Sequence, residues 1–175
     1  MEPPVVPADR FEGWQYVERT TERPFAAGPV SVTAETVRYE RTDIDDPRPF
    51  CFASRLRIRP GGNPNPALTR LVENRAKTGF RERLADRDIE GVTLQGERTL
   101  AVDDPAASAA TLVTFQGRCS VRGEESVPVE ALLAVWVADE YLLAGGAYRV
   151  DGHGGVDADD ARRELLGLVR GVRPE

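Results

Sequence analysis

The stretch from Val129 to Val150 reads VEALLAVWVADEYLLAGGAYRV and is the most apolar part of the 175-residue chain. A membrane-spanning helix needs about 20 mainly apolar residues, yet Asp139 and Glu140 lie together in the middle of this stretch. An aspartate at the centre of a bilayer costs about 2.5–3.5 kcal/mol. The stretch therefore predicts an antiparallel hairpin, with strands at 129–137 and 141–150 and a turn at 138–140.

Both strands of this hairpin are apolar on both faces over much of their length. Strands of this kind lie at the centre of a sheet, with a further layer on each side. A glycine inside a strand often marks a place where another backbone or a helix comes close. We therefore expect Gly145 and Gly146 to lie on a central strand under a C-terminal helix.

The rest of the chain predicts further strands and two amphipathic helices. Alternating side chains indicate a strand, and apolar residues three and four positions apart indicate a helix. The predicted strands are Phe11–Glu18, Val30–Glu40, Phe52–Arg59, Gly91–Val102 with a break near Gly96, and Ala110–Arg122. The predicted helices are Pro66–Ala85, capped by Asn63 or Asn65, and a last helix capped by Asp157. Residues 20–29 are expected to form a turn region.

This order of elements predicts the α+β class, with one antiparallel sheet of about six to seven strands. A long central helix and a C-terminal helix are expected to pack on the sheet. Three prolines among the first seven residues predict a flexible N-terminal arm at residues 1–10, so that residues 11–175 form a single domain. Gly79 weakens the middle of the first helix, and we expect it to allow close packing on the sheet.

The charge balance narrows the classes of partner. The formal net charge is −6, and Lys77 is the single lysine among 23 basic residues. An acid excess with almost no lysine is typical of a halophilic protein of a salt-rich cytoplasm, although a GC-rich genome also favours arginine. An acidic chain is poorly suited to nucleic acid or to an anionic membrane surface. Because the N-terminus has neither a basic nor an apolar signal region, we expect a cytoplasmic location.

The order of strands and helices, with a strand containing Gly145-Gly146 that leads into a C-terminal amphipathic helix, resembles the Mog1/PsbP-like α+β fold over residues 11–173. The segment LLAGGAYRVDG is also similar to the end of small haloarchaeal proteins, some of them lipoproteins. The chain lacks a lipobox cysteine near its start, so lipid anchoring does not carry over. The resemblance implies a non-enzymatic accessory subunit, a GTPase-binding factor or a secretion chaperone, and it carries no site residue with it.

Candidate catalytic and metal-binding residues are few. The single histidine, His153, lies in the glycine-rich loop DGHGG, and a general base needs a more rigid setting. One histidine and two distant cysteines, Cys51 and Cys119, do not have the spacing of a zinc site. In a reducing cytosol the two cysteines are expected to be buried thiols. We therefore expect no catalytic residue, no metal and no cofactor.

The most distinctive candidate site is the arginine row, formed by Arg55, Arg57 and Arg59 on one face of a predicted strand. Three cations about 6.6–6.8 Å apart could bind an acidic protein partner or a phosphorylated ligand. The alternative is a solvated face balanced by acids such as Glu35 or Glu97. Trp14, Tyr16 and Trp136 could line a groove, or they could belong to the core.

These patterns lead to two functional expectations. The first is a non-enzymatic binding or accessory module whose partner contacts the arginine row. The second is a small-ligand carrier with a pocket between the sheet and the long helix. A pocket of about 300 Å³ or more, lined by aromatic side chains, would favour the carrier. An enzyme ranks below both and is disfavoured, because the chain offers no set of nucleophile, base and orienting group.

Overall fold

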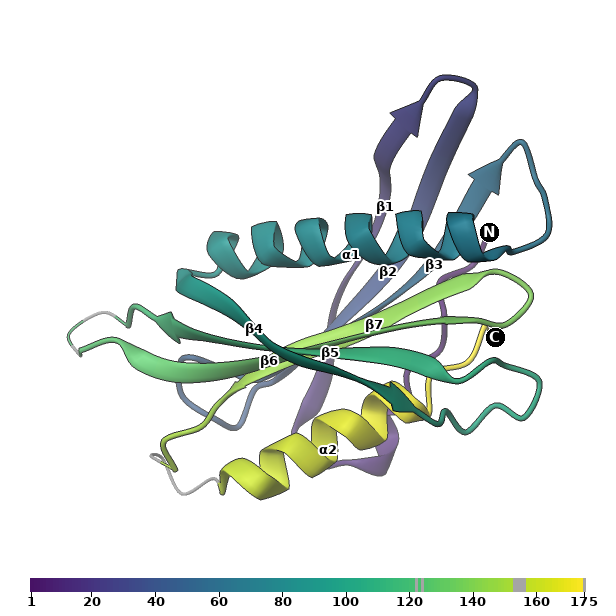
Figure 1. Cartoon of the computed structure of the whole chain (residues 1–175). Helices are drawn as coiled ribbons and strands as arrows, with labels where there is room; N and C mark the ends of the chain where they lie inside the picture. Colours follow the sequence, from purple (N-terminus) through teal and green to yellow (C-terminus); the bar gives the residue numbers. More distant parts are fainter. Residues whose placement is uncertain (122, 124, 153–156, 175) are drawn as a thin grey trace.

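The structure is a computed structural model that describes residues 1–121, 123, 125–152 and 157–174. Within these residues, seven strands form one antiparallel sheet, and α1 and α2 cover its opposite faces (Figure 1). The strands are β1 (Trp14–Ala27), β2 (Val30–Arg41), β3 (Phe50–Arg59), β4 (Ile89–Leu100), β5 (Ala110–Cys119), β6 (Val127–Val137) and β7 (Tyr141–Arg149). The helices are α1 (Pro66–Asp86), α2 (Ala158–Arg170) and a short 3-10 helix, η1 (Ala8–Arg10). The predicted α+β class is confirmed.

The predicted hairpin lies at the centre of the sheet. The strands follow the order β1-β2-β3-β7-β6-β5-β4, which makes β7 the middle strand. β6 and β7 pair from Val129 opposite Arg149 to Val137 opposite Tyr141. Because α1 covers one face and α2 the other, both sets of alternating side chains in this hairpin are buried, which explains their apolar character.

The glycine pair fits its central position for a reason that differs partly from the prediction. A β-carbon on Gly146 would lie 3.0 Å from Leu165 Cδ1 of α2, but it would first overlap the carbonyl oxygen of Phe50 on β3. A β-carbon on Gly145 would overlap the carbonyl oxygen of Leu132 on β6. The neighbouring strands therefore require both glycines, and only Gly146 also contacts the C-terminal helix.

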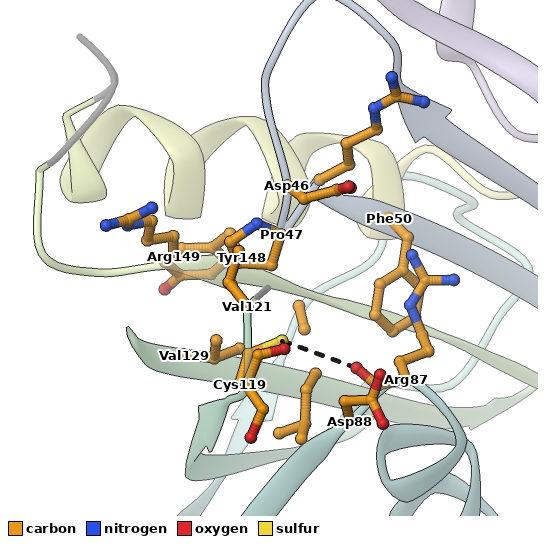
Figure 2. A pocket seen from close by; sticks show the side chains of 14 residues that line it. Asp46, Pro47, Phe50, Arg87, Asp88, Cys119, Val121, Val129, Tyr148 and Arg149 are labelled. Carbon is orange, nitrogen blue, oxygen red and sulfur yellow. Dashed lines mark hydrogen bonds between the residues drawn. The ribbon is translucent and has the colours of Figure 1, made fainter. Parts of the chain in front are cut away.

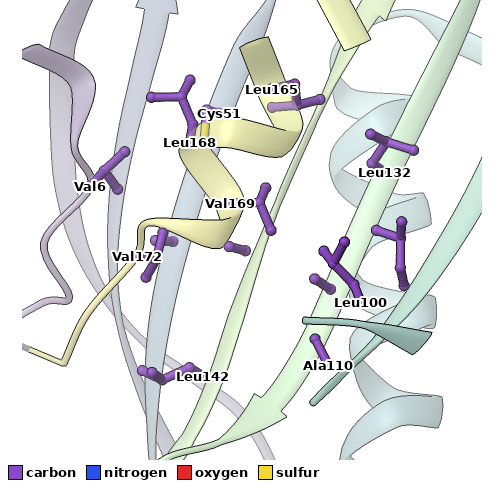
Figure 3. Packing of buried hydrophobic residues seen from close by; sticks show 14 of the residues in the cluster. Val6, Cys51, Leu100, Ala110, Leu132, Leu142, Leu165, Leu168, Val169 and Val172 are labelled. Carbon is purple, nitrogen blue, oxygen red and sulfur yellow. The ribbon is translucent and has the colours of Figure 1, made fainter. Parts of the chain in front are cut away.

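Two apolar clusters hold the helices on the sheet. The cluster under α2 combines helix residues such as Leu165 and Leu168 with sheet residues such as Cys51, Leu132 and Leu142 (Figure 3). The cluster under α1 joins the helix residues Val72, Phe80 and Leu84 to Phe52, Phe115 and Leu133 of the sheet. Burial of a side chain of this size contributes about 1.5–3 kcal/mol, so the two clusters provide most of the driving force for folding.

Side-chain caps start both helices as the sequence predicts. Asn65 is the N-cap of α1, and its side chain accepts a hydrogen bond of 2.9 Å from the amide of Leu68. Asp157 caps α2 by accepting a bond of 2.8 Å from the amide of Asp159. Each cap satisfies a backbone donor that the helix leaves without a partner.

The first edge strand is longer than predicted. β1 continues through residues expected to form a turn, and the turn itself contains Gly28, whose φ is +59°. Pro24 lies in the irregular part of β1, between Glu22 and Phe25, where the pairing register shifts. Proline is tolerated there because the outer side of an edge strand needs no backbone donor.

The other edge strand also corrects a prediction. β4 is continuous across Gly96, where a break was expected, and it has register shifts on either side of Leu94. Bulges of this kind twist an edge strand and reduce its tendency to pair with another chain.

No helix among the described residues has both the length and the apolar character that a membrane span requires.

The N-terminal segment is not the separate arm that its prolines predict. Val5 and Arg173 exchange backbone hydrogen bonds of 2.9 and 3.1 Å, and Val6 is buried in the cluster under α2. The buried side chain here is that of Val6, whereas Val5 is exposed and contributes only its backbone pairing. The prolines rule out a helix but still allow one isolated bridge, and this explains the correction.

Candidate functional site

The arginine row lies on the face of β3 that also contains Cys51 and Ala53, the face covered by α2. Arg55 Nε donates to Glu140, which lies in the β6–β7 turn, and Arg57 Nε lies 3.7 Å from Glu140 Oε1. Arg55 is only 18% exposed, whereas Arg59 is exposed. Two arginines of the row are therefore held by a carboxylate of the same chain.

Both acids expected to balance the row have other partners, although Glu35 lies directly opposite Arg55 on β2. Glu35 accepts from Arg19 at 3.2 Å and from Thr21 at 2.8 Å. Glu97 forms an ion pair with Lys77. One acid that contacts the row comes from the hairpin turn, because the β3–β7 pairing places Leu142 opposite Arg55 and so brings Glu140 close.

One hollow, of about 430 Å³, lies at the end of the sheet where β3 begins and β5 ends (Figure 2). Its floor includes Phe50 and Val129, and its rim carries Arg87 and Asp88. The Arg87 guanidinium lies 4.0 Å from the centre of the Phe50 ring and forms an ion pair of 2.9 Å with Glu40. Arg87 is therefore already occupied by contacts within the chain.

Cys119 lines this hollow, and its thiol donates a weak hydrogen bond of 3.6 Å to the carbonyl oxygen of Arg87 (Figure 2). Burial raises the pKa of the Cys119 thiol, and the nearby Asp88 carboxylate raises it further. A thiol with a raised pKa is a poor nucleophile at neutral pH, because the thiolate is the reactive form. The hollow therefore shows no activated cysteine.

The prediction of two buried thiols is confirmed. Cys51 and Cys119 are both free and buried. Cys51 belongs to the cluster under α2 and Cys119 to the cluster under α1, so the sheet lies between them. Burial raises the pKa of Cys51 to about 12.

A second hollow, of about 460 Å³, lies between α1 and the β1–β3 side of the sheet. We call it the α1 groove. Its floor consists of apolar strand residues and one serine: Val32, Ala34, Phe52, Ser54, Leu56, Leu133 and Leu143. Its helix wall carries Val72, Ala76, Gly79 and Phe80, together with the polar or charged residues Arg75, Thr78, Glu82, Arg83 and Asp86. The floor is therefore apolar apart from Ser54, whereas α1 and β1 border the space with several charged side chains.

The groove exists because α1 is attached more firmly over one half of the sheet. On the β4–β5 side, Glu73 accepts a hydrogen bond of 3.0 Å from Thr111, and Lys77 forms its ion pair with Glu97. The sheet is strongly twisted, so β1–β3 run steeply away from β4–β7 (Figure 1). A straight helix that follows β4–β7 consequently leaves space above β2 and β3.

Gly79 leaves an open position in the helix wall of the groove. A β-carbon placed on Gly79 would have nothing within 4 Å apart from its chain neighbours and the backbone of its own helix. The expectation that Gly79 allows close packing on the sheet is therefore wrong. A glycine inside a helix costs about 0.8–1.0 kcal/mol relative to alanine, and here no protein contact offsets that cost.

An ion pair crosses the groove near the C-terminal end of α1. Arg83 of α1 lies 3.0 Å from Glu22 of β1, and its guanidinium lies 5.4 Å from the centre of the Phe52 ring. The Arg83 and Glu22 side chains are 33% and 49% exposed. An ion pair this accessible contributes about 0–1 kcal/mol, so thermal motion opens it at little cost.

The aromatic residues considered from the sequence do not form the groove. Trp14 donates to Glu164 of α2, Trp136 is buried in the cluster under α2, and Tyr16 is exposed at the edge of the sheet. The aromatic walls are instead Phe52 and Phe80, whose ring centres lie 5.6 Å apart. In the sequence both occupy ordinary core positions, so nothing there distinguishes a groove wall from a filled core.

The described residues contain no group of three His, Cys, Asp or Glu side chains that could hold a metal ion. His153, considered above as a loop residue, lies outside the residues that the structure describes.

Fold and groove together define a class of protein: a single antiparallel α+β sheet with a helix on each face and a ligand-sized groove under the longer helix. The family model described as a domain of unknown function, DUF6517, matches residues 3–173, and the chain belongs to this family. No curated protein and no solved structure matches the chain.

Proposed function

We propose that this protein is a non-enzymatic carrier that binds a small, mainly apolar molecule in the α1 groove. The observation that carries the proposal is a space of about 460 Å³ with an apolar floor and an open helix position at Gly79. Small-molecule sites typically have volumes of about 300–1,000 Å³ and walls of apolar and aromatic side chains. The two phenylalanines of the groove, Phe52 and Phe80, match that description.

A partner module that uses the arginine row has less support. Such a module needs cations that are free to bind an external anion, whereas Glu140 already contacts Arg55 and Arg57. The hollow beside Cys119 also gives less support, because its Arg87 is paired with Glu40. The groove lies under the long helix and has an apolar floor, and this favours a carrier over a docking module.

The proposal includes three expectations from the sequence: a Mog1/PsbP-like fold, a halophilic character and a cytoplasmic location. A Mog1/PsbP-like fold would place the protein among α+β domains that mostly bind rather than catalyse. The net charge of −6 supports a halophilic protein that acts in the cytoplasm. The protonated state of Cys119 at neutral pH, which its raised pKa favours, supports a role without covalent chemistry.

Filling the groove tests the proposal. The probe is N-phenyl-1-naphthylamine, an uncharged dye whose fluorescence rises in apolar surroundings. Gly79→Leu would place an apolar side chain in the space that the probe occupies, and this removes about 1.5 kcal/mol of contact with the probe. We expect a rise in Kd of about tenfold.

Ala85→Leu is the matched control, since Ala85 is an exposed residue of α1 outside the groove. The control should bind the dye as the wild type does. Equal affinity of wild type and Gly79→Leu, or no binding to either, would reject the carrier.

A further inference from the structure

The floor of the α1 groove contains one polar feature. The hydroxyl oxygens of Thr36 and Ser54 lie 2.6 Å apart, opposite each other on β2 and β3, and the two residues are 2% and 3% exposed. Each hydroxyl has one hydrogen to donate, and the bond between them uses only one of the two. The second hydroxyl hydrogen has no acceptor among the described residues.

A buried donor without an acceptor is unfavourable, so it marks a place where an acceptor from outside the chain is favoured. Ser54 itself lines the groove, while Thr36 lies beside it on the neighbouring strand β2. Whichever hydroxyl donates within the pair, the two oxygens form one unit that can offer its remaining hydrogen to a bound molecule. On either side of Ser54 along β3, the floor residues Phe52 and Leu56 are apolar.

The surroundings of the hydroxyl pair favour an uncharged acceptor. The charged residues that line the groove come from α1 and from β1, whereas the floor around Ser54 is apolar, with Leu143 as its partner on β7. Arg83 is held by Glu22 at the mouth. An ionised carboxylate at the floor would lose its hydration without gaining a cation, which is strongly unfavourable.

We infer that the ligand is an uncharged, mainly apolar molecule with a carbonyl oxygen that accepts a hydrogen bond from the Thr36–Ser54 pair. The inference rests on the proposed function and specifies the class of ligand. The apolar body lies between Phe52 and the helix wall, and the oxygen points to the floor. A ketone or ester fits this description, whereas a hydrocarbon or a carboxylate does not.

Three ligands of nearly the same shape test this inference by isothermal titration calorimetry. They are 2-acetylnaphthalene, which is a ketone, 2-isopropenylnaphthalene, which is its hydrocarbon counterpart, and 2-naphthoate, which is the anion. Each is titrated into the wild-type protein and into the double variant Thr36→Val, Ser54→Ala. The measured quantity is the ratio of the ketone affinity to the hydrocarbon affinity, because this ratio cancels most of the difference in hydration between the two molecules.

The ratio should fall by about 2- to 12-fold in the double variant, as expected for the loss of one hydrogen bond. An unchanged ratio with both ligands bound would overturn the inference and leave the carrier intact. Naphthoate that binds more tightly than the ketone, and equally well to the double variant, would also overturn it. If none of the three binds to the wild type, the proposed function fails as well. Should the double variant not fold, Ser54→Ala alone is measured, with the same outcomes.

Discussion

Replacing Gly79 by alanine is expected to stabilise the protein. Gly79 lies inside α1, where glycine is about 0.8–1.0 kcal/mol less favourable than alanine. The new methyl group would extend into the groove, where nothing beyond its chain neighbours and its own helix backbone lies within 4 Å of it. No steric cost opposes the gain in helix propensity, so the free energy of unfolding should rise by about 0.8–1.0 kcal/mol.

Thermal unfolding followed by circular dichroism at 222 nm checks this value. For a chain of this size, 1 kcal/mol corresponds to a shift of about 2–4 °C, so we expect a midpoint higher by about that amount. Urea unfolding should give the same change in free energy with an unchanged m value. A midpoint that stays the same or falls would refute the reasoning, because it would mean that α1 packs on the sheet at Gly79 and leaves no groove there.

Four further predictions follow from other parts of the fold. Gly146→Ala should lower the free energy of unfolding by about 1–3 kcal/mol, because its β-carbon would overlap the Phe50 carbonyl; an unchanged urea midpoint would contradict this. Burial raises the pKa of Cys51 to about 12, so its contribution is complete below about pH 8.5 and is lost as the pH rises toward 12. Unfolding midpoints of Cys51→Ala should therefore decrease less with pH over that range than those of the wild type, and equal slopes would speak against this. Replacing the whole arginine row by serine should leave the fold intact, and if it leaves the recovery of acidic partners from lysate unchanged as well, the row has no docking role. If the acid excess is a halophilic adaptation, the melting temperature should continue to rise beyond about 0.3 M salt, where screening alone is nearly complete; a plateau there would argue for a GC-rich genome only.

Local sequence signals predicted the parts of the fold that depend on local chemistry. The hairpin of β6 and β7 could be found because Asp139 and Glu140 interrupt a long apolar run at the position where the turn lies. The caps Asn65 and Asp157 could be found because few residue types satisfy the first amides of a helix. Each of these features depends on neighbours within a few positions of the chain.

The features that failed depend on contacts between distant segments. The length of β1 follows from its pairing with β2, which overrides the turn signal of Pro24. The burial of Val6 follows from the area of sheet that α2 leaves uncovered. Glu140 reaches the arginine row only because β7 pairs with β3, a pairing that no local pattern reveals.

The sequence raised a pocket between the sheet and the long helix as one alternative, but it could not show that this space is open or which residues line it. Phe52 and Phe80 have the spacing of core residues, and Gly79 has the same appearance whether it allows close packing or leaves space. The difference depends on the twist of the sheet under α1, which separates β1–β3 from the helix (Figure 1). Only the relative placement of helix and sheet distinguishes a filled core from a groove.

A titration of ¹⁵N-labelled protein with N-phenyl-1-naphthylamine, followed by amide chemical shifts, tests the central claim most directly. The carrier account predicts that shifts concentrate at the groove, at Ser54, Gly79 and Leu143, and that amides of the other hollow, such as Ser120, stay unchanged. Shifts that concentrate around Ser120 and Cys119, or that are absent throughout at saturating dye, would contradict it.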